Sequence, residues 1–493
     1  MLFNSYVFIF VFLPVAILGF FTLSQWIGKT VAKLWLTVAS FIFYGYWNVV
    51  YVPLLIVSIS LNYITGNAIS KAVPGGRSSK FLLGFGVVAN LGIIGYYKYA
   101  NFFVDSANHI FKSQFLLSDI LLPLAISFYT FTQIAYLVDA YRGETRNTRY
   151  SFLDYSLFVV FFPQLIAGPI LRHNELIPQL KQRKTFIFSC KNFGLGLVLF
   201  SLGLSKKVLI ADNIAPWISP IFNHAEIASF IESWVGALSY TFQLYFDFSG
   251  YSDMAIGLGL MFNINLPINF NSPYKAVSIV DFWRRWHITL SNFLRDYLYI
   301  SLGGNRHGSM RRYLNLFITM LLGGLWHGAG WTFVLWGGLH GVYLAINHFW
   351  KTLRFQLLKS VGSTISFIAV VAGWVLFRSN TISDAIHLLK SMFGLNGIVL
   401  PGEAGGKLSV LTNLGFELRS WNELTLLPDL YGKKVLVFGA LFALWIVVTQ
   451  FPNTQQILQN VKPQRVWAIG LGLLSALCLL SLNRVSEFLY FQF

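Results

Sequence analysis

Charged side chains are scarce in this sequence. Only 11% of its 493 residues are charged, whereas 55% are hydrophobic and 17% are aromatic. Soluble globular proteins carry roughly 25% charged residues, so a soluble chain of this length would lack the polar residues that its surface needs. The composition therefore argues against a soluble protein and predicts that much of the surface faces the lipid bilayer.

Cysteine is almost absent. Cys190 and Cys478 are the two cysteines of the chain, and both lie in or beside apolar runs. Two cysteines cannot build a disulfide framework or a thiolate metal site. We expect both to behave as small hydrophobic side chains, and we expect no bound metal and no bound cofactor.

Acidic residues are few relative to basic ones, and the net charge of +17 would fit a nucleic-acid partner. The basic residues instead gather in short loops between apolar runs, as in proteins of the cytoplasmic membrane. Lys29 and Lys33 follow the first run, and Lys71 and Arg77 follow the third. These loops predict a bacterial inner-membrane protein whose N-terminus is outside. The first run lacks a basic start and a cleavage site, so it is predicted to be a retained helix.

The apolar runs predict an all-α polytopic membrane protein of one domain, residues 1–493. A spanning helix needs about 20 mostly apolar residues. About a dozen segments qualify by that length rule: 5–26, 33–47, 50–70, 81–103, 121–141, 151–170, 190–210, 234–262, 313–330, 331–350, 362–378, 434–450 and 464–482.

Two segments depart from simple spanning. The run 151–170 is followed by another basic loop, and it contains the helix breakers Pro163, Gly168 and Pro169. It is predicted to be re-entrant, because non-helical backbone is tolerated at membrane depth where protein buries it. Residues 379–432 contain no convincing span and are predicted to form an extramembrane segment.

The segment 281–300 predicts a basic amphipathic helix. At about 100° per residue, Arg284, Arg285 and Arg295 share one side of a helical wheel, and Trp286 lies on the apolar side. Such a helix anchors a protein in the membrane interface. Its arginines would also suit an anionic acyl donor, such as a phosphopantetheine thioester. Both interpretations remain open on the spacing alone.

Histidine and aspartate also occur within apolar runs, where ionisable side chains are costly and often functional. His327 lies between glycines in LLGGLWHGAGW, and Asp247 and Asp253 lie in YFDFSGYSDM. The carboxylates would serve a transporter or a substrate site, or they would pair with arginines and fix the fold. His340 and His348 are about two helical turns apart and give weak support for metal.

A histidine suits one reaction in particular. Its unperturbed pKa of about 6.5 lets it remove the proton from a hydroxyl that attacks an acyl group. Burial of such a base would protect a thioester from hydrolysis. The sequence has no G-x-S-x-G elbow and no Walker-type loop, so neither a serine acyl-enzyme nor a nucleotide hydrolase has support.

Several long stretches resemble the membrane-bound O-acyltransferase family. They are VFIFVFLPV, GYYKYANFFVDS, ILLPLAISFYTFTQIAYLVDAYRG, FPQLIAGPILR, YFDFSGYSDMAIGLGLMFNINLPINFNSPY, FWRRWHITLSNFLRDYLYISLGGNR, LLGGLWHGAGWTFVLWGGLHG and the terminal FLYFQF. The nearer resemblance is to the bacterial branch that acetylates exopolysaccharides such as alginate and also peptidoglycan. The stretches cover most of residues 1–380.

The resemblance implies a fold and a set of site residues. The fold is a ring of tilted helices with re-entrant and interfacial helices around a central tunnel, and the catalytic core is expected within 121–350. The resemblance makes His327 the catalytic histidine and His287 its assistant. Donor binding is expected from Arg284, Arg285, Arg295 and Trp286, and supporting positions are expected at Asp247, Tyr251, Asp253, Gln164 and Trp326.

The implied function is transfer of an acyl group, acetyl in particular, from a cytosolic thioester such as acetyl-coenzyme A. The acceptor is expected to be a cell-envelope polysaccharide, reached through an extracytoplasmic transferase partner. Gln164 stands where the alginate branch carries histidine, which puts alginate itself in doubt. The D-alanyl branch, which modifies teichoic acids, is shorter and matches less well. A transporter or flippase of a polysaccharide precursor is the alternative from another class.

Overall fold

The computed structural model describes the whole chain except residues 119, 147, 149, 354–355, 403–408, 463, 483–488 and 490–493. The terminal FLYFQF stretch therefore lies outside the described residues, apart from Leu489. Regular structure in the described part is almost entirely helical. The all-α architecture expected from the apolar runs is confirmed.

The α-helices follow one another along the chain with few long connections. The first twelve are α1 (Leu13–Trp26), α2 (Lys29–Gly45), α3 (Val52–Lys71), α4 (Arg77–Ile94), α5 (Ala100–Phe111), α6 (Ile126–Tyr141), α7 (Phe152–Val160), α8 (Phe162–Leu165), α9 (His173–Leu176), α10 (Cys190–Ser205), α11 (Asp212–Ile214) and α12 (Ser219–Asn223). The others are α13 (Phe230–Met261), α14 (Ile279–Trp283), α15 (Ile288–Phe293), α16 (Gly308–His327), α17 (Trp331–Thr352), α18 (Lys359–Arg378), α19 (Ile382–Met392), α20 (Leu436–Gln450), α21 (Thr454–Asn460) and α22 (Arg465–Leu480).

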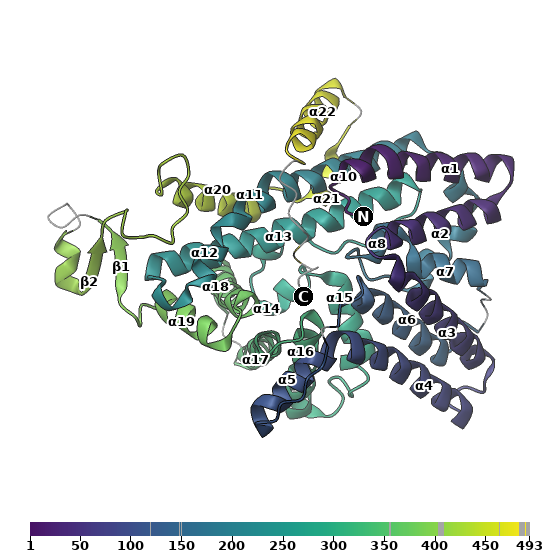
Figure 1. Ribbon diagram of the computed structural model, residues 1–493, viewed down its shortest axis with the longest axis horizontal. Helices are drawn as coiled ribbons and strands as arrows, with labels where there is room; N and C mark the ends of the chain where they lie inside the picture. Colours follow the sequence, from purple (N-terminus) through teal and green to yellow (C-terminus); the bar gives the residue numbers. More distant parts are fainter. Residues whose placement is uncertain are drawn as a thin grey trace.

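Four π-helical segments extend or join these helices. They are η1 (Phe8–Phe12), η3 (Gly95–Tyr99), η6 (Lys206–Ala211) and η10 (Leu294–Tyr299). In Figure 1 the short helices α8, α14 and α15 lie in the interior, beside the long helix α13.

Fewer helices can cross a bilayer than the apolar runs suggested. Five stretches of the described chain are long and apolar enough: Phe8–Trp26, Val49–Lys71, Arg77–Phe111, Cys190–Asn223 and Lys359–Arg378. Helices α20 and α21, bent by 59°, make a sixth if they are counted together. Judged by length and composition, the described helices do not provide the expected dozen or so spans. One reason is length, because at 1.5 Å per residue a helix as short as α7 cannot cross about 30 Å of hydrocarbon.

The segment 151–170 is broken as predicted. Helix α7 ends at Val160, Phe161 adopts a non-helical conformation (ψ 106°), and α8 runs for four residues only. All residues from 154 to 171 are buried. Because protein covers this irregular backbone, it satisfies the condition under which a re-entrant segment is tolerated.

Close packing of α10 against α13 organises the interior. A Cβ added to Gly196 would lie 2.6 Å from the carbonyl oxygen of Gly257, and one added to Gly250 would lie 2.7 Å from that of Gly203. Glycine at these positions lets the two backbones touch, as in other membrane helix pairs. Nearly every residue of α13 is buried as a result.

Residues 379–432 contain no spanning helix in their described part. Helix α19 begins with a capping box formed by Thr381 and Asp384. It is held to α13 by a hydrogen bond of 3.0 Å from the Trp234 indole to the carbonyl of Met392. Two short parallel strands follow, β1 (Ile398–Pro401) and β2 (Phe416–Arg419). The extramembrane position of this segment stays a prediction.

Candidate active site

His327 is the last residue of α16 and is buried, with 4% of its surface exposed. The helix ends there because Gly328 is extended (φ −159°, ψ 151°). Aromatic rings surround the imidazole, with centroids of Trp326, Trp336 and Phe377 between 4.9 and 5.4 Å away. The side chain is thus held at a helix end and shielded from bulk water.

His287 lies where the chain turns between α14 and α15. It has a left-handed conformation (φ 44°), which is uncommon for a residue other than glycine. Its side chain is fully buried, and its ring centroid is 6.3 Å from that of His327. The two histidines expected from the resemblance are therefore neighbours in the fold.

Asn269 fixes the orientation of His287. The Asn269 Oδ1 atom accepts hydrogen bonds from the backbone N–H of Thr289 at 3.2 Å and from its hydroxyl at 2.9 Å. Nδ1 of His287 lies 3.2 Å from the same oxygen. Because that oxygen can only accept, Nδ1 of the neutral ring carries the hydrogen and Nε2 carries the lone pair. The motif NFNSPY thus supplies a residue that orients the second histidine.

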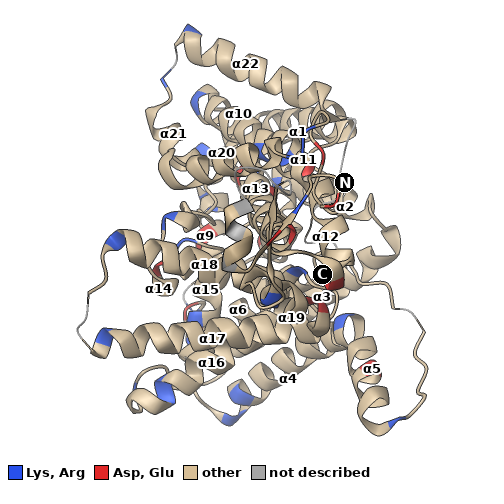
Figure 2. Ribbon diagram, turned by 90° about the vertical axis from the view of Figure 1, so that its left-hand side faces the viewer, with Lys and Arg blue, Asp and Glu red and all other residues tan. Residues whose placement is uncertain are grey.

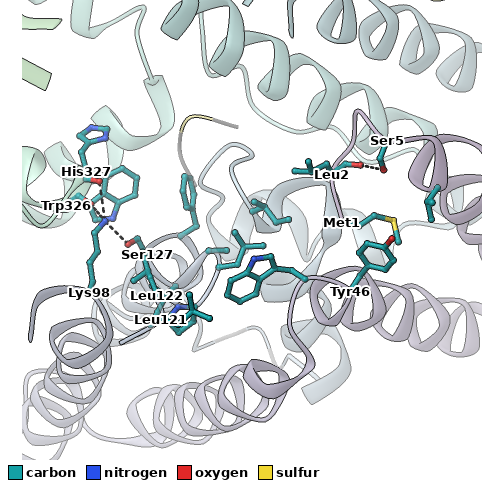
Figure 3. A pocket seen from close by; sticks show the side chains of 18 residues that line it. Met1, Leu2, Ser5, Tyr46, Lys98, Leu121, Leu122, Ser127, Trp326 and His327 are labelled. Atoms are coloured by element: carbon teal, nitrogen blue, oxygen red, sulfur yellow. Dashed lines mark hydrogen bonds between the residues drawn. The ribbon is translucent and has the colours of Figure 1, made fainter. Parts of the chain in front are cut away.

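One pocket, of about 560 Å³, reaches His327. Figure 3 shows Met1, Leu2, Ser5 and Tyr46 at one end and Lys98, Trp326 and His327 at the other. Most of the lining is apolar: Val7, Trp47, Leu121, Leu122, Pro123, Leu124, Ala125, Ile126, Phe128 and Ile166 complete it with Ser127. We name this cavity the apolar pocket.

A second pocket, of about 490 Å³, is more polar. Arg172, Arg295, Asp296 and Tyr297 line it, together with Asn174, Glu175, Asn292, Thr289 and several apolar side chains. Asp296 is ion-paired with Arg172 and also with Arg295, whose Nε lies 2.6 Å away. The Arg172 guanidinium stacks 5.1 Å from the centre of the Tyr297 ring. We name this cavity the arginine pocket.

The charge of Asp296 is stabilised within this cluster. Partial burial alone would raise the pKa of its carboxyl, but hydrogen bonds and positive charge from Arg295 and Arg172 outweigh that effect. The pKa of Asp296 is therefore held below its ordinary value. At neutral pH the arginine pocket contains an ionised carboxylate between two guanidinium groups.

A thin aromatic layer separates the two pockets. Phe293 lines the arginine pocket and stacks on Phe131, with ring centroids 4.4 Å apart. The Phe131 ring in turn lies 5.4 Å from that of Trp326, which lines the apolar pocket. Trp326 also lies 6.0 Å from His287. Of the supporting positions expected from the sequence, Trp326 is thus next to both histidines.

The donor-binding residues expected from the amphipathic helix are only partly brought together. The continuous helix 281–300 is wrong, because the chain forms α14, the turn at His287, α15 and η10 instead. Arg295 lines the arginine pocket, whereas Arg285 pairs with Asp281 at 2.9 Å and Arg284 is exposed away from the pocket. The helical wheel failed because left-handed backbone at His287 interrupts its period.

Trp286 is buried in the protein core and does not lie in a lipid headgroup region. Its ring centroid is 4.9 Å from that of Trp374 and 5.1 Å from that of Phe270. The interfacial anchor predicted for the apolar side of this segment is therefore wrong for Trp286, which is 2% exposed. Packing against α18 and the loop before α14 decided its position.

The remaining supporting positions make contacts that fix the fold. Asp247 and Asp253 form ion pairs of 2.7 and 2.6 Å with Lys207 and Lys206 of η6. The backbone N–H of Leu489 also donates to Asp247. Ion pairing of both carboxylates was one of the two expectations, although the partners are lysines and not the arginines of 281–300.

Tyr251 and Gln164 likewise contact neighbouring helices. Tyr251 stacks on Phe3 with centroids 4.6 Å apart, and the Gln164 amide donates to the carbonyl of Phe158. Both side chains are buried. These contacts join Tyr251 to the N-terminal turn before η1 and Gln164 to α7.

Metal-ligating groups are sparse in the described residues. Asp139, Glu144 and His173 place their ligand atoms within 4.8 Å of one another. Arg142 lies 3.9 Å from the Asp139 carboxylate and puts a competing positive charge beside it. His340 accepts a hydrogen bond of 3.3 Å from the Trp283 indole and does not belong to this group.

Known proteins match this chain over most of its length. Residues 142–377 match the model of the membrane-bound O-acyltransferase family. The chain is 48% identical to a peptidoglycan O-acetyltransferase of Helicobacter pylori over 428 residues, which cover 81% of each chain. It is 46% identical to the probable alginate O-acetylase AlgI of Pseudomonas aeruginosa, over 80% of this chain and 75% of that one.

The chain belongs to the membrane-bound O-acyltransferase family. It is therefore a multi-pass membrane enzyme that transfers acyl groups, as the sequence predicted. Similarity to a teichoic acid D-alanyltransferase of Bacillus subtilis is lower, at 26% identity over 52% of this chain. The expected order of resemblance, with the O-acetyltransferase branch first, is confirmed.

The sequence analysis missed several residues of this candidate site. Asn269 and Arg172 lie in motifs that the resemblance includes, but their spacing gives no sign that they meet His287 or Arg295. Arg172 is 124 positions from Asp296, its ion-pair partner. One sequence feature could have pointed to Arg172, namely its place directly after the predicted re-entrant segment 151–170. Such a segment returns the chain to the membrane side from which it entered, and so places Arg172 on that side.

Proposed function

We propose that this enzyme transfers an acetyl group from a cytosolic thioester to a hydroxyl on the outer side of the bacterial cytoplasmic membrane. The final product would be an acetylated cell-envelope polysaccharide. The observation that supports this most directly is the placement of His327 and His287 beside an aromatic layer with a pocket on each side. The catalytic core would lie within residues 121–350.

The arginine pocket suits the donor. Under the orientation given by the basic loops, it opens to the cytoplasm. In Figure 2 several Lys and Arg residues gather around α9, α14 and α15, on the opposite side from the N-terminus and α5. Arg172 and Arg295 would bind the phosphates of a donor such as acetyl-coenzyme A, because guanidinium groups pair with phosphate through two parallel hydrogen bonds.

The histidines suit the chemistry at the layer between the pockets. His327 would take the proton of the acceptor hydroxyl while its oxygen bonds to the acyl carbon. The carbon–sulfur bond then breaks, and the departing thiolate takes the proton from the imidazolium to leave as a free thiol. His287 would assist through Nε2, which carries the lone pair of its neutral ring. The apolar surroundings exclude water that would otherwise hydrolyse the thioester.

The apolar pocket suits the acceptor side. Under the same orientation it opens outward, near the N-terminus. Its lining of leucine, isoleucine and aromatic side chains offers few hydrogen-bonding groups for a sugar chain. An extracytoplasmic transferase would therefore present the hydroxyl and then pass the acetyl group to the polysaccharide. The names of the relatives point to peptidoglycan or alginate as that polysaccharide, and Gln164 weighs against alginate.

Ester-linked acetate on the envelope polysaccharide of a deletion strain tests this function. The strain would carry the wild-type gene, His327→Ala, His287→Ala or the exposed control His224→Ala, at equal membrane abundance. Loss of a general base typically slows a reaction by about 10²–10⁴-fold, so His327→Ala should leave almost no acetate and His224→Ala should leave it unchanged. Full acetylation by His327→Ala would overturn the catalytic assignment.

The transporter alternative makes the opposite prediction. A flippase that used Asp247 and Asp253 would tolerate His327→Ala and would fail in Asp253→Asn at equal abundance. Purified enzyme in vesicles would then release no thiol from acetyl-coenzyme A. Thiol release that depends on His327 would exclude this alternative.

A further inference from the structure

The end of α16 has a cap that neither the family match nor the histidine chemistry accounts for. The last four carbonyl groups of an α-helix lack partners within the helix. In α16 these belong to Gly324, Leu325, Trp326 and His327. The extended Gly328 turns the chain away directly afterwards, so the carbonyl groups need partners from elsewhere.

Two adjacent residues of η3 provide those partners. Lys98 Nζ donates to the carbonyl of Trp326 at 2.6 Å and to that of His327 at 3.3 Å. The Tyr99 hydroxyl donates to the carbonyl of Leu325 at 2.7 Å. Three consecutive carbonyls of the helix that ends at His327 are thus bound by two consecutive side chains, more than 220 positions away in sequence.

The π-helical backbone of η3 explains how both side chains reach one target. In a regular α-helix, neighbouring side chains diverge by about 100°. A π-helix has more residues per turn, so neighbouring side chains diverge by a smaller angle. Single π-helical turns of this kind are frequent at functional sites. Beyond η3, the hydroxyl of Ser106 in α5 accepts a hydrogen bond of 3.2 Å from the Trp331 indole at the start of α17. Residues 98–106 therefore hold both sides of the Gly328–Gly330 turn.

The charge of Lys98 suits this position. A positive group at a helix C-terminus is stabilised by the helix dipole, and hydrogen bonds from an ammonium group are stronger than neutral ones. Lys98 forms no ion pair with a carboxylate in the described part of the chain. Its third proton points to Ser127 Oγ at 3.4 Å, and Figure 3 shows these contacts at the end of the apolar pocket.

We propose that Lys98, together with Tyr99, is a positioning residue that fixes the last turn of α16 and thereby holds His327 in place at the end of the apolar pocket. The three protons of the ammonium group are directed to Ser127, Trp326 and His327, so Lys98 acts through the helix end and not on the substrate. This inference rests on the proposed function, because it assigns a purpose to the orientation of His327.

Purified enzyme in vesicles, assayed for thiol release from acetyl-coenzyme A with a simple alcohol such as glycerol as the acceptor, tests the proposal. Lys98→Met keeps the aliphatic stem and removes every donor, so we expect kcat to fall on the order of 100-fold. The KM for the donor should stay unchanged, because the arginine pocket is on the other side of the aromatic layer. Lys98→Arg restores a cationic donor, so its kcat should exceed that of Lys98→Met by at least about tenfold.

Tyrosine variants separate positioning from general stability. Tyr99→Phe removes the hydrogen bond to Leu325 and should lower kcat by a smaller factor than Lys98→Met. Tyr63→Phe is the matched control, because the Tyr63 hydroxyl donates to the carbonyl of Tyr150 at 3.0 Å, and Tyr150 is not in the apolar pocket. It should leave kcat at the wild-type value.

Failure of this inference differs from failure of the proposed function. If His327→Ala abolishes thiol release while Lys98→Met keeps wild-type kcat, Lys98 does not position His327 but the reaction stands. An equal loss of kcat in Lys98→Met, Lys98→Arg and Tyr63→Phe would also overturn the inference, since it would mean general destabilisation. If His327→Ala retains full activity, the proposed function itself fails.

Discussion

The close contact between α16 and α17 predicts that a single methyl group added at Gly337 will lower the acetylation rate sharply. A Cβ added to Gly337 of α17 would collide with the carbonyl oxygen of Met320 and lie 3.0 Å from the Cα of Gly324. Ordinary Cβ contacts begin at 3.4 Å, and backbone atoms cannot rotate aside. The two helices would have to separate by on the order of 1 Å, because packed helices do not deform locally. His327 lies one turn beyond Gly324 and would move with α16.

The expected magnitudes follow from that displacement. Overpacking lowers the free energy of unfolding by about 1–3 kcal/mol. Replacement of a helical glycine by alanine raises it by about 1 kcal/mol. Gly337→Ala should therefore fold, with a free energy of unfolding reduced by at most about 2 kcal/mol. A misplacement of about 1 Å in a catalytic group lowers rates by about 100-fold, so the acetylation rate should fall by that factor.

The matched control is the next residue. A Cβ added to Gly338 would lie 3.7 Å from the Phe317 ring, an ordinary contact. Gly338→Ala should therefore keep the wild-type rate and melt at the same or a slightly higher temperature. Rate per unit of membrane protein and melting in detergent would be measured for both variants. Wild-type activity of Gly337→Ala, with melting like that of Gly338→Ala, would refute the reasoning.

Two other predictions come from the charged residues. Lys207→Met leaves Asp247 and Asp212 buried without the ammonium group that lies 2.7 and 2.8 Å from them, so stability should fall by about 3–5 kcal/mol and membrane abundance with it; wild-type abundance would contradict this. Arg172→Met should raise the KM for a phosphate-bearing donor on the order of tenfold, with kcat unchanged, as measured by thiol release. Because the pKa of Asp296 is lowered on folding, its ion pairs are complete above the unfolded pKa of about 3.9 and are lost only as the pH falls below it. The donor KM should therefore show no titration from Asp296 between pH 5 and 8, and a transition in that range that disappears in Asp296→Asn would contradict this account.

The broken segment 281–300 illustrates where sequence patterns fail. A helical wheel assumes one helical period throughout the segment. His287 interrupts that period because its backbone is left-handed, which the presence of a histidine does not predict. The hydrogen bonds from Thr289 and His287 to Asn269 stabilise that turn. They join two segments that the sequence gives no reason to pair. Arg284 and Arg285 consequently point away from the arginine pocket, although they share a helical face with Arg295 on paper.

Composition and local pattern were enough to establish the membrane class and the all-α architecture, because lipid contact demands apolar side chains and internally bonded backbone. The motif around His327 was enough to identify the family. Tertiary structure alone decided which residues hold the two histidines and line the two pockets. Lys98, Asn269 and Arg172 come from distant segments, and their roles depend on helix ends and turns that meet only when the chain is folded. Long-range contacts of this kind leave no periodicity in a single sequence, and so the reaction class could be predicted while the details of the site could not.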